Sequence, residues 1–155
     1  MCAFCDDPSL TYPEYLARMA ELVDKYGWAV QGVERERHRP PWAYTVGLTP
    51  CGRPELLITG LPLRRSTELL NRMGAQLLCR ETPAPGERLR LVDGPLVEFV
   101  RVEHPDVHLL TALALYGPDV RGLQVVWADD RDQWPWERGF RGRRGGQPVL
   151  GPRAA

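Results

Sequence analysis

Apolar residues recur at helical spacing in three stretches of the chain. Residues 11–26 place apolar side chains three and four positions apart, and Thr11 and Glu14 have capping-box spacing at their start. Residues 63–78 repeat the helical spacing with arginines on the outer face, and residues 109–116 are almost wholly apolar. We therefore predict three helices, and we expect the last of them to be buried.

The remaining apolar segments have the length and punctuation of β-strands. They are short, and Pro, Gly or Asp-Gly turn signals lie between them. Six strands are predicted at residues 28–33, 42–48, 55–61, 89–91, 96–103 and 123–128, with a short closing strand at 147–150. Helices and strands together predict an α+β domain, namely a strongly bent antiparallel β-sheet or a split β-barrel with about three packed helices.

Composition is typical of one globular domain. The chain has 155 residues, 43% of them hydrophobic, which fits a single domain over residues 1–155 with one core. Within it we expect residues 1–8 to be a flexible segment and residues 138–155 to form a loop and tail.

Net charge and hydropathy indicate which classes of partner the protein lacks. The 20 basic and 20 acidic residues cancel, so no global field attracts nucleic acid or an anionic membrane. The sequence shows no apolar run of about 18 residues and no secretory signal pattern. We therefore predict a cytoplasmic protein without nucleic-acid or membrane partners.

The second and third predicted strands carry small polar residues among apolar ones, a pattern typical of the floor of a ligand pocket. Thr45 and Thr59 offer hydroxyl groups, while Gly47 and Gly60 leave room for a ligand to approach the backbone. Ordinary core strands show the same pattern, so that alternative stays open.

A second polar and aromatic cluster follows the strand at 123–128. Asp129 and Asp130 precede Trp134 and Trp136, whose rings supply flat apolar walls while the carboxylates orient a polar ligand or bind a cation. A turn capped by aspartates, with the tryptophans closing the core, is the alternative. We predict a pocket between the two clusters, with the ligand-binding residues Trp42, Tyr44, Thr45, Gly47, Thr59, Arg64, Gln124, Trp127, Asp129, Trp134 and Trp136.

Cysteine spacing suggests a metal hypothesis. Cys2 and Cys5 have the C-x-x-C spacing that supplies half of a tetrahedral zinc site, and further ligands would have to come from Cys51, Cys79 or the histidines. A chain terminus with two incidental thiols is the alternative. No nucleophile with a readable base and no glycine-rich phosphate loop is found, so no catalytic residue is assigned.

Two histidines are spaced for a shared metal. His104 and His108 would face one metal if both were helical, but Pro105 and Asp106 look like the helix start. This start would leave His104 outside the helix.

Several sequence blocks resemble one bacterial family, the actinobacterial-type domain of unknown function 4262. The resemblance implies no activity and brings no catalytic residues. One departure is Ala128-Asp129-Asp130, where many relatives have Pro-Asp followed by Gly. The matching blocks are Gly27-Trp28, Tyr44-Thr45-Val46-Gly47-Leu48, Pro54-Glu55-Leu56, Thr59-Gly60-Leu61-Pro62, Leu70-Asn71, Tyr116-Gly117, Leu123-Gln124-Val125-Val126-Trp127-Ala128-Asp129 and Trp134-Pro135-Trp136-Glu137.

The order of elements also resembles the split β-barrel of flavin reductases and pyridoxamine-phosphate oxidases. That resemblance implies flavin phosphate at Thr45, Thr59 and Arg64 or Arg65, in a site between two protomers. It implies that Trp127 or Trp136 covers the flavin ring.

These patterns lead to a functional hypothesis with two alternatives. We hypothesise a small-ligand or cofactor-binding domain, with a flavin-type oxidoreductase as its narrower form. The alternatives are a non-enzymatic protein-interaction module that uses exposed tryptophans and the arginine-glycine loop at 138–146, and a metal-binding protein built on Cys2, Cys5 and the histidines. Flavin and zinc stay open as cofactors, and a small molecule or a second copy of the chain stays open as a partner.

Overall fold

The computed structural model describes residues 7, 9–143 and 145–155, and the chain forms an α+β domain, as predicted. Of the segment 1–8, which was predicted to be flexible, only residue 7 is described. Cys2 and Cys5 lie outside the described residues. The helices are α2 (Tyr12–Tyr26), α3 (Leu63–Cys79), α4 (Pro105–His108) and α5 (Leu110–Tyr116), with a 3-10 turn η1 (Thr49–Cys51). The strands are β1 (Ala29–Val33), β2 (Trp42–Val46), β3 (Glu55–Thr59), β4 (Arg88–Arg90), β5 (Leu96–Arg101) and β6 (Gly122–Trp127).

The six strands form one open, mixed sheet in the order β1-β2-β3-β6-β5-β4. Neighbouring strands are antiparallel except β3 and β6, which are parallel, so the antiparallel expectation fails for this one pair. The chain leaves β3, passes through α3, the β4–β5 hairpin and α5, and returns as β6 in the direction of β3. A parallel pair needs such a long crossover, and the local pattern of β6 does not reveal it.

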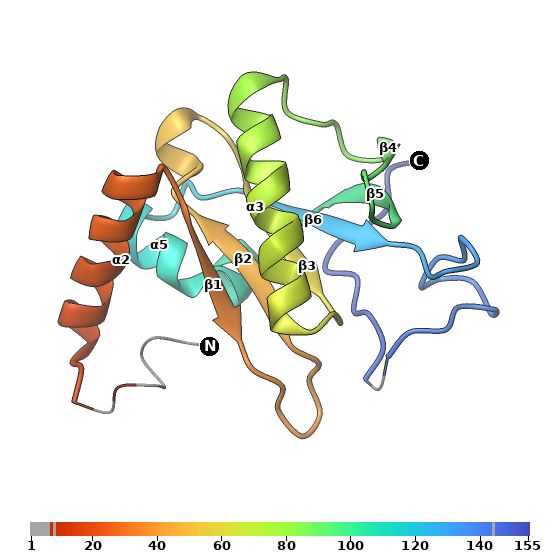
Figure 1. Cartoon of the computed structure of the whole chain (residues 1–155), viewed down its shortest axis with the longest axis horizontal. Coiled ribbons are helices and arrows are strands. Elements are labelled where there is room, and N and C mark those ends of the chain that lie inside the picture. The colour runs from red at the N-terminus through yellow and green to blue at the C-terminus, as the bar shows by residue number, and fades with distance from the viewer. Residues whose placement is uncertain (1–6, 8, 144) are drawn as a thin grey trace.

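Helices cover both faces of the sheet (Figure 1). α3 packs on one face against residues such as Ala43, Leu56 and Ile58. α2 and α5 pack on the opposite face against Tyr44 and Leu57. Side chains of adjacent strand residues point to opposite faces, which is why the two sets alternate along β2 and β3.

The first helix begins where its sequence predicts. Thr11 is the N-cap of α2, and its backbone N–H donates to the Glu14 carboxylate at 2.7 Å. The Glu14 backbone N–H in turn contacts the Thr11 hydroxyl at 3.4 Å, which completes the capping box. Gly27 ends the helix with a positive φ of 89°.

The predicted helix at 109–116 is shorter and more exposed than expected. A turn at Leu109 separates α4 from α5, and Leu110 is 58% exposed. His104 lies at the N-cap position of α4, just outside the helix, as the proline predicts. An apolar composition alone therefore overestimates burial here.

The predicted closing strand at 147–150 is a latch without regular strand pairing. It lies beside β6 and β3 and is held to them mainly by hydrogen bonds between side chains and backbone, not by regular backbone pairing. The Gln124 side-chain N–H donates to the Pro148 carbonyl at 2.7 Å, and the Leu150 backbone N–H donates to the Gln124 side-chain oxygen at 2.7 Å. Gln147 bonds the backbone of Trp127 in both directions, at 2.9 and 2.8 Å.

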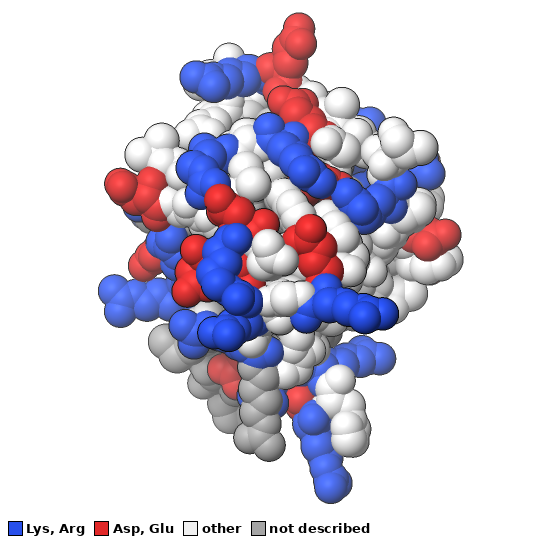
Figure 2. Space-filling view, turned by 90° about the vertical axis from the view of Figure 1, so that its right-hand side faces the viewer, with Lys and Arg blue, Asp and Glu red and all other residues white. Residues whose placement is uncertain are grey.

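Charges of both signs are interspersed on the face shown in Figure 2. This agrees with the zero formal net charge of the chain. Among the described residues, no helix is long and apolar enough to cross a membrane.

Candidate functional site

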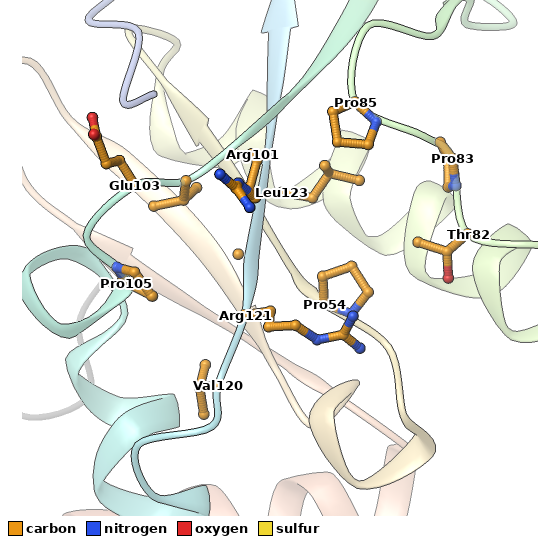
Figure 3. A pocket seen from close by; sticks show the side chains of 12 residues that line it. Pro54, Thr82, Pro83, Pro85, Arg101, Glu103, Pro105, Val120, Arg121 and Leu123 are labelled. Atoms are coloured by element: carbon orange, nitrogen blue, oxygen red, sulfur yellow. The ribbon is translucent and has the colours of Figure 1, made fainter. Parts of the chain in front are cut away.

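A cavity of about 480 Å³ opens at the edge of the sheet where β5 ends and β6 begins (Figure 3). Segments that are far apart in sequence meet there: the residue before β3, the connector after α3, the end of β5 with the start of α4, and the start of β6. We call this cavity the arginine cleft. Its lining residues are Pro54, Thr82, Pro83, Pro85, Arg101, Val102, Glu103, Pro105, Val120, Arg121, Gly122 and Leu123.

The floor of the arginine cleft is apolar and buried. Pro54, Val120 and Leu123 are buried, and Leu123 belongs to the core on the α3 side of the sheet. The exposed connector carrying Pro83 and Pro85 forms one wall (Figure 3). A buried apolar floor with a proline-rich wall suits the apolar part of a ligand.

Two arginines bring positive charge to this floor. Arg101 is paired with Leu123 in the β5–β6 register, and Arg121 lies two residues before Leu123. Residues in such a diagonal relation share one face of the sheet, at a separation of about 7–8 Å. Both side chains line the cleft, and Figure 3 shows their guanidinium groups at separate places in its lining.

The two arginines differ in how they are held. One Arg121 N–H donates to the Gly52 carbonyl at 2.9 Å, which fixes the side chain and leaves its other donors available. Within the described part of the chain, the Arg101 guanidinium has no hydrogen bond or ion pair. The acidic lining residue, Glu103, turns its carboxylate away from both guanidinium groups (Figure 3).

Two other cavities of similar size lack this combination. A hollow of about 590 Å³ around Arg53 and residues 78–82 has no buried residue in its lining. In a hollow of about 540 Å³ the two lining arginines are already paired, Arg90 with Asp132 at 2.8 Å and Arg65 with Glu68 at 3.6 Å. The arginine cleft joins a buried apolar floor to an arginine that has no ion pair among the described residues, and it is the better candidate.

Most of the polar groups predicted to bind a ligand are engaged within the protein. The hydroxyl of Tyr44, which is 2% exposed, accepts from the Thr111 backbone N–H at 3.0 Å. The Thr59 hydroxyl donates to the Pro148 carbonyl at 2.8 Å, and Gln124 holds the same segment. The latch thus occupies Thr59 and Gln124, while α5 occupies the hydroxyl of Tyr44.

The glycines of the predicted floor make room for the chain itself. Gly47 has a φ of 125°, and a Cβ there would lie 2.9 Å from the Gly27 carbonyl oxygen. At Gly60 a Cβ would lie 2.5 Å from the Gly146 oxygen. Both are close approaches of backbone to backbone, which only glycine permits.

Thr45 forms a hydrogen bond to a buried carboxylate, that of Glu55. Its hydroxyl donates to Glu55 at 2.7 Å and accepts from the Leu56 backbone N–H at 2.8 Å. Glu55, which the predicted site did not include, is completely buried at the start of β3. This pairing links two of the sequence blocks that carry the family resemblance.

The tryptophans of the predicted pocket are packing residues. The Trp127 indole N–H donates to the Thr59 carbonyl at 2.9 Å, and its ring packs on Phe140. Trp134 and Trp136 stack with ring centroids 5.2 Å apart on the opposite face of the sheet. All five tryptophans are buried or half-buried, so they do not form the exposed surface expected of an interaction module.

The predicted site residues do not share one cavity. Trp42 and Thr59 line a cavity of about 200 Å³, and Asp129 lines the paired-charge hollow. Arg64 is 93% exposed and pairs with Glu68 on the surface of α3. That these residues bind a ligand stays a prediction.

Asp129 closes a turn after β6. Its carboxylate accepts from the backbone N–H groups of Arg131, Gln133 and Arg141 at 2.8–2.9 Å. Burial alone would raise the pKa of Asp129, but the three amide donors and the Arg131 charge bring that pKa below its usual 3.8.

Asp129→Asn is expected to make the fold less stable at pH 7 and less sensitive to acid. Because the folded-state pKa is lowered, the carboxylate stabilises the fold fully above pH 3.8, and this stabilisation is lost as the pH falls through the folded value. Urea unfolding of the wild type and the variant over an acid pH series measures the free energy of unfolding of each. The difference between the two values should become smaller towards low pH. Asp130→Asn is the exposed control. A difference in the free energy of unfolding that stays constant with pH would contradict the lowered pKa of Asp129.

No metal site is assembled in the described part of the chain, where no group of three His, Cys, Asp or Glu side chains is placed to hold an ion. Cys51 and Cys79 are free and exposed. The predicted Cys2–Cys5 ligands lie outside the described residues, so that prediction is not tested.

A family model described as a domain of unknown function, DUF4262, matches residues 22–141. The chain belongs to the DUF4262 family. The matched range contains every residue that lines the arginine cleft of this DUF4262 chain. No curated protein and no solved structure matches the chain.

Sequence reasoning missed the two arginines of this DUF4262 chain. Arg101 lies near the end of the predicted strand at 96–103, and Arg121 lies two residues before the predicted strand at 123–128. Each looks like an ordinary solvated arginine by itself. The signal that would have placed both arginines at one cleft is the pairing of β5 with β6. This pairing sets Arg101 opposite Leu123, two residues after Arg121.

Proposed function

We propose that this DUF4262 domain binds a small organic anion in the arginine cleft. The observation that carries the proposal is the Arg101 guanidinium, which has no hydrogen bond or ion pair among the described residues and which lines, together with Arg121, a cleft with a buried apolar floor. A partner of opposite charge would complete the hydrogen bonding of this group.

The size and chemistry of the cleft define the class of ligand. Its volume of about 480 Å³ lies in the range of about 300–1,000 Å³ that small-molecule sites occupy. Guanidinium groups present paired N–H donors that match a carboxylate or phosphate. The ligand should therefore carry such a group on an apolar body that rests on Pro54, Val120 and Leu123.

The flavin hypothesis is a narrower form of this proposal. Flavin mononucleotide joins a phosphate to a flat ring and so belongs to the proposed class. In this proposal Arg101 and Arg121 take the role that the split-barrel resemblance assigned to Thr45, Thr59 and Arg64.

Matched acid and neutral compounds test the proposal by isothermal titration calorimetry. The pairs are flavin mononucleotide with riboflavin, and 2-naphthoate with 2-naphthamide. We expect at least one acid to bind more tightly than its neutral partner. Arg101→Ala should weaken that binding roughly 10- to 100-fold, because a charged hydrogen bond contributes about 1.5–3 kcal/mol.

Arg64→Ala is the control, because it removes an equally charged residue that the sequence also assigned to phosphate. It should leave the affinity unchanged, and Arg121→Ala should weaken it. The proposal is wrong if no acid binds better than its neutral partner, or if Arg101→Ala binds that acid as well as the wild type does.

A further inference from the structure

A second, smaller cavity lies near the other end of β3. Its volume is about 200 Å³, and we call it the His108 cleft. The loop before β2, the end of β3, helix α4 and the latch meet there. The lining residues are Arg39, Pro40, Trp42, Thr59, Val107, His108, Pro148 and Leu150.

The walls of the His108 cleft are largely apolar, and one of them is an indole. The Trp42 N–H donates to the backbone carbonyl of His108 at 3.3 Å, which fixes the ring against α4. With its polar atom engaged, Trp42 offers the cleft a flat apolar surface. A volume of about 200 Å³ holds roughly seven water-sized groups, enough for a single ring with a small substituent.

Two nitrogen-bearing side chains reach this cavity from different elements. Arg39 comes from the loop between β1 and β2, and its guanidinium has no hydrogen bond or ion pair within the described residues. His108 comes from the last position of α4 and is half-buried. A cation and an imidazole at one apolar hollow can bind an anion together.

We propose that the His108 cleft is a second anion site, which takes a compact aromatic carboxylate and binds it more tightly as the pH falls. The ring would lie against Trp42, and the carboxylate would lie between Arg39 and His108. This proposal concerns a different cavity and does not rest on the arginine cleft.

The charges around His108 support this pH dependence. Burial, followed by the charges of Arg39 and His104, lowers the pKa of His108 below its usual 6.5, while Asp106 acts in the opposite direction. The remaining lining residues carry no charge. A pKa lowered from 6.5 favours the neutral form of His108 at pH 7 in the free protein.

A bound carboxylate changes this balance. It offsets the positive field of Arg39 and so favours the imidazolium form, which raises the pKa of His108 on binding. Binding is then accompanied by proton uptake, and affinity increases by up to about tenfold for each unit that the pH falls between the free and bound pKa values.

Benzoate and its neutral analogue benzamide test the proposal. We would titrate each at pH 6 and pH 8, following the histidine ring signals by NMR and the affinity by calorimetry. Benzoate should bind more tightly at pH 6 than at pH 8, by up to about tenfold for each pH unit, and shift the His108 titration upward. Benzamide should bind more weakly, with the same affinity at both pH values.

Variants separate the contributions. His108→Gln should remove the pH dependence, and Arg39→Ala should weaken benzoate at both pH values, whereas Arg37→Ala in the same loop should not. Arg101→Ala should leave benzoate binding unchanged, which distinguishes this site from the arginine cleft. The inference is overturned if benzoate does not bind at pH 6, if its affinity is independent of pH, or if His108→Gln keeps the pH dependence.

Discussion

Replacing Glu55 by alanine is expected to lower the free energy of unfolding by about 3–5 kcal/mol. The Glu55 carboxylate is completely buried and has no cation beside it in the described structure. It accepts instead from the backbone N–H groups of Gly47, Leu48 and Thr49 at 2.9–3.3 Å, and from the Thr45 and Thr49 hydroxyls at 2.7 Å. Alanine would leave these donors without an acceptor in a dry environment.

Glu55→Gln should cost less, about 1–3 kcal/mol. The amide keeps one acceptor oxygen but turns an NH₂ group towards donors that need an acceptor. Urea unfolding at pH 7 measures both variants, provided that the m-value stays constant. Glu68→Ala, on the exposed face of α3, is the control and should change stability by less than about 1 kcal/mol. A Glu55→Ala variant as stable as this control would contradict the assigned role.

The Glu55 cluster also positions the arginine cleft. The Glu55 backbone N–H donates to the Arg121 carbonyl at 2.9 Å, and Pro54, the preceding residue, forms part of the floor. Loss of the carboxylate would therefore loosen the loop before β3 next to the cleft. We attribute the family resemblance at Tyr44–Leu48 and Pro54–Leu56 to this structural linkage.

Local sequence signals predicted the elements of the fold and failed at their long-range arrangement. Thr11, Glu14 and Gly27 specify the ends of α2 because capping depends on neighbouring residues. The apolar run of β6 is compatible with either strand direction, so it could not reveal the parallel pairing with β3. The turn at Leu109 was missed because Leu109 was assigned to the apolar helix predicted at 109–116.

The candidate site was harder to predict for a related reason. Thr59 and Gln124 were recognised as polar residues in buried strands, but a sequence does not say whether their partner is a ligand or the chain itself. Here the partner is the latch, whose contacts with Gln124 lie 24 and 26 residues further along the chain. The arginine cleft depends on β5–β6 pairing and on the connector after α3, and neither is encoded by residues adjacent in sequence.

Removal of both arginines that bind Glu98 is expected to be as damaging as the loss of Glu55. Glu98 is 2% exposed on β5, and its carboxylate pairs with Arg88 at 2.7 Å and Arg153 at 3.2 Å. Each arginine also covers an indole, Arg88 over Trp134 at 4.6 Å and Arg153 over Trp136 at 3.8 Å. The acid, the two cations and the stacked rings thus fasten the end of the chain to the sheet.

The loss in the free energy of unfolding should depend on whether the arginines or the Glu98 charge is removed. Arg88→Ala with Arg153→Ala leaves a buried carboxylate without a cation, so we expect a loss of about 3–5 kcal/mol. Glu98→Gln leaves two arginines that are 46% and 43% exposed and can turn to water, so we expect about 1–3 kcal/mol. Arg64→Ala with Arg72→Ala is the exposed control and should cost less than about 1 kcal/mol.

A triple variant gives the decisive comparison, measured by urea unfolding at pH 7. Adding Glu98→Gln to the double arginine variant removes the unpaired buried charge, so the triple variant should be more stable than the double one. Loss of ring packing affects both variants equally and cancels in this comparison. If the triple variant is less stable than the double variant, the carboxylate is not the group that requires the arginines, and cation–ring packing holds the chain end instead.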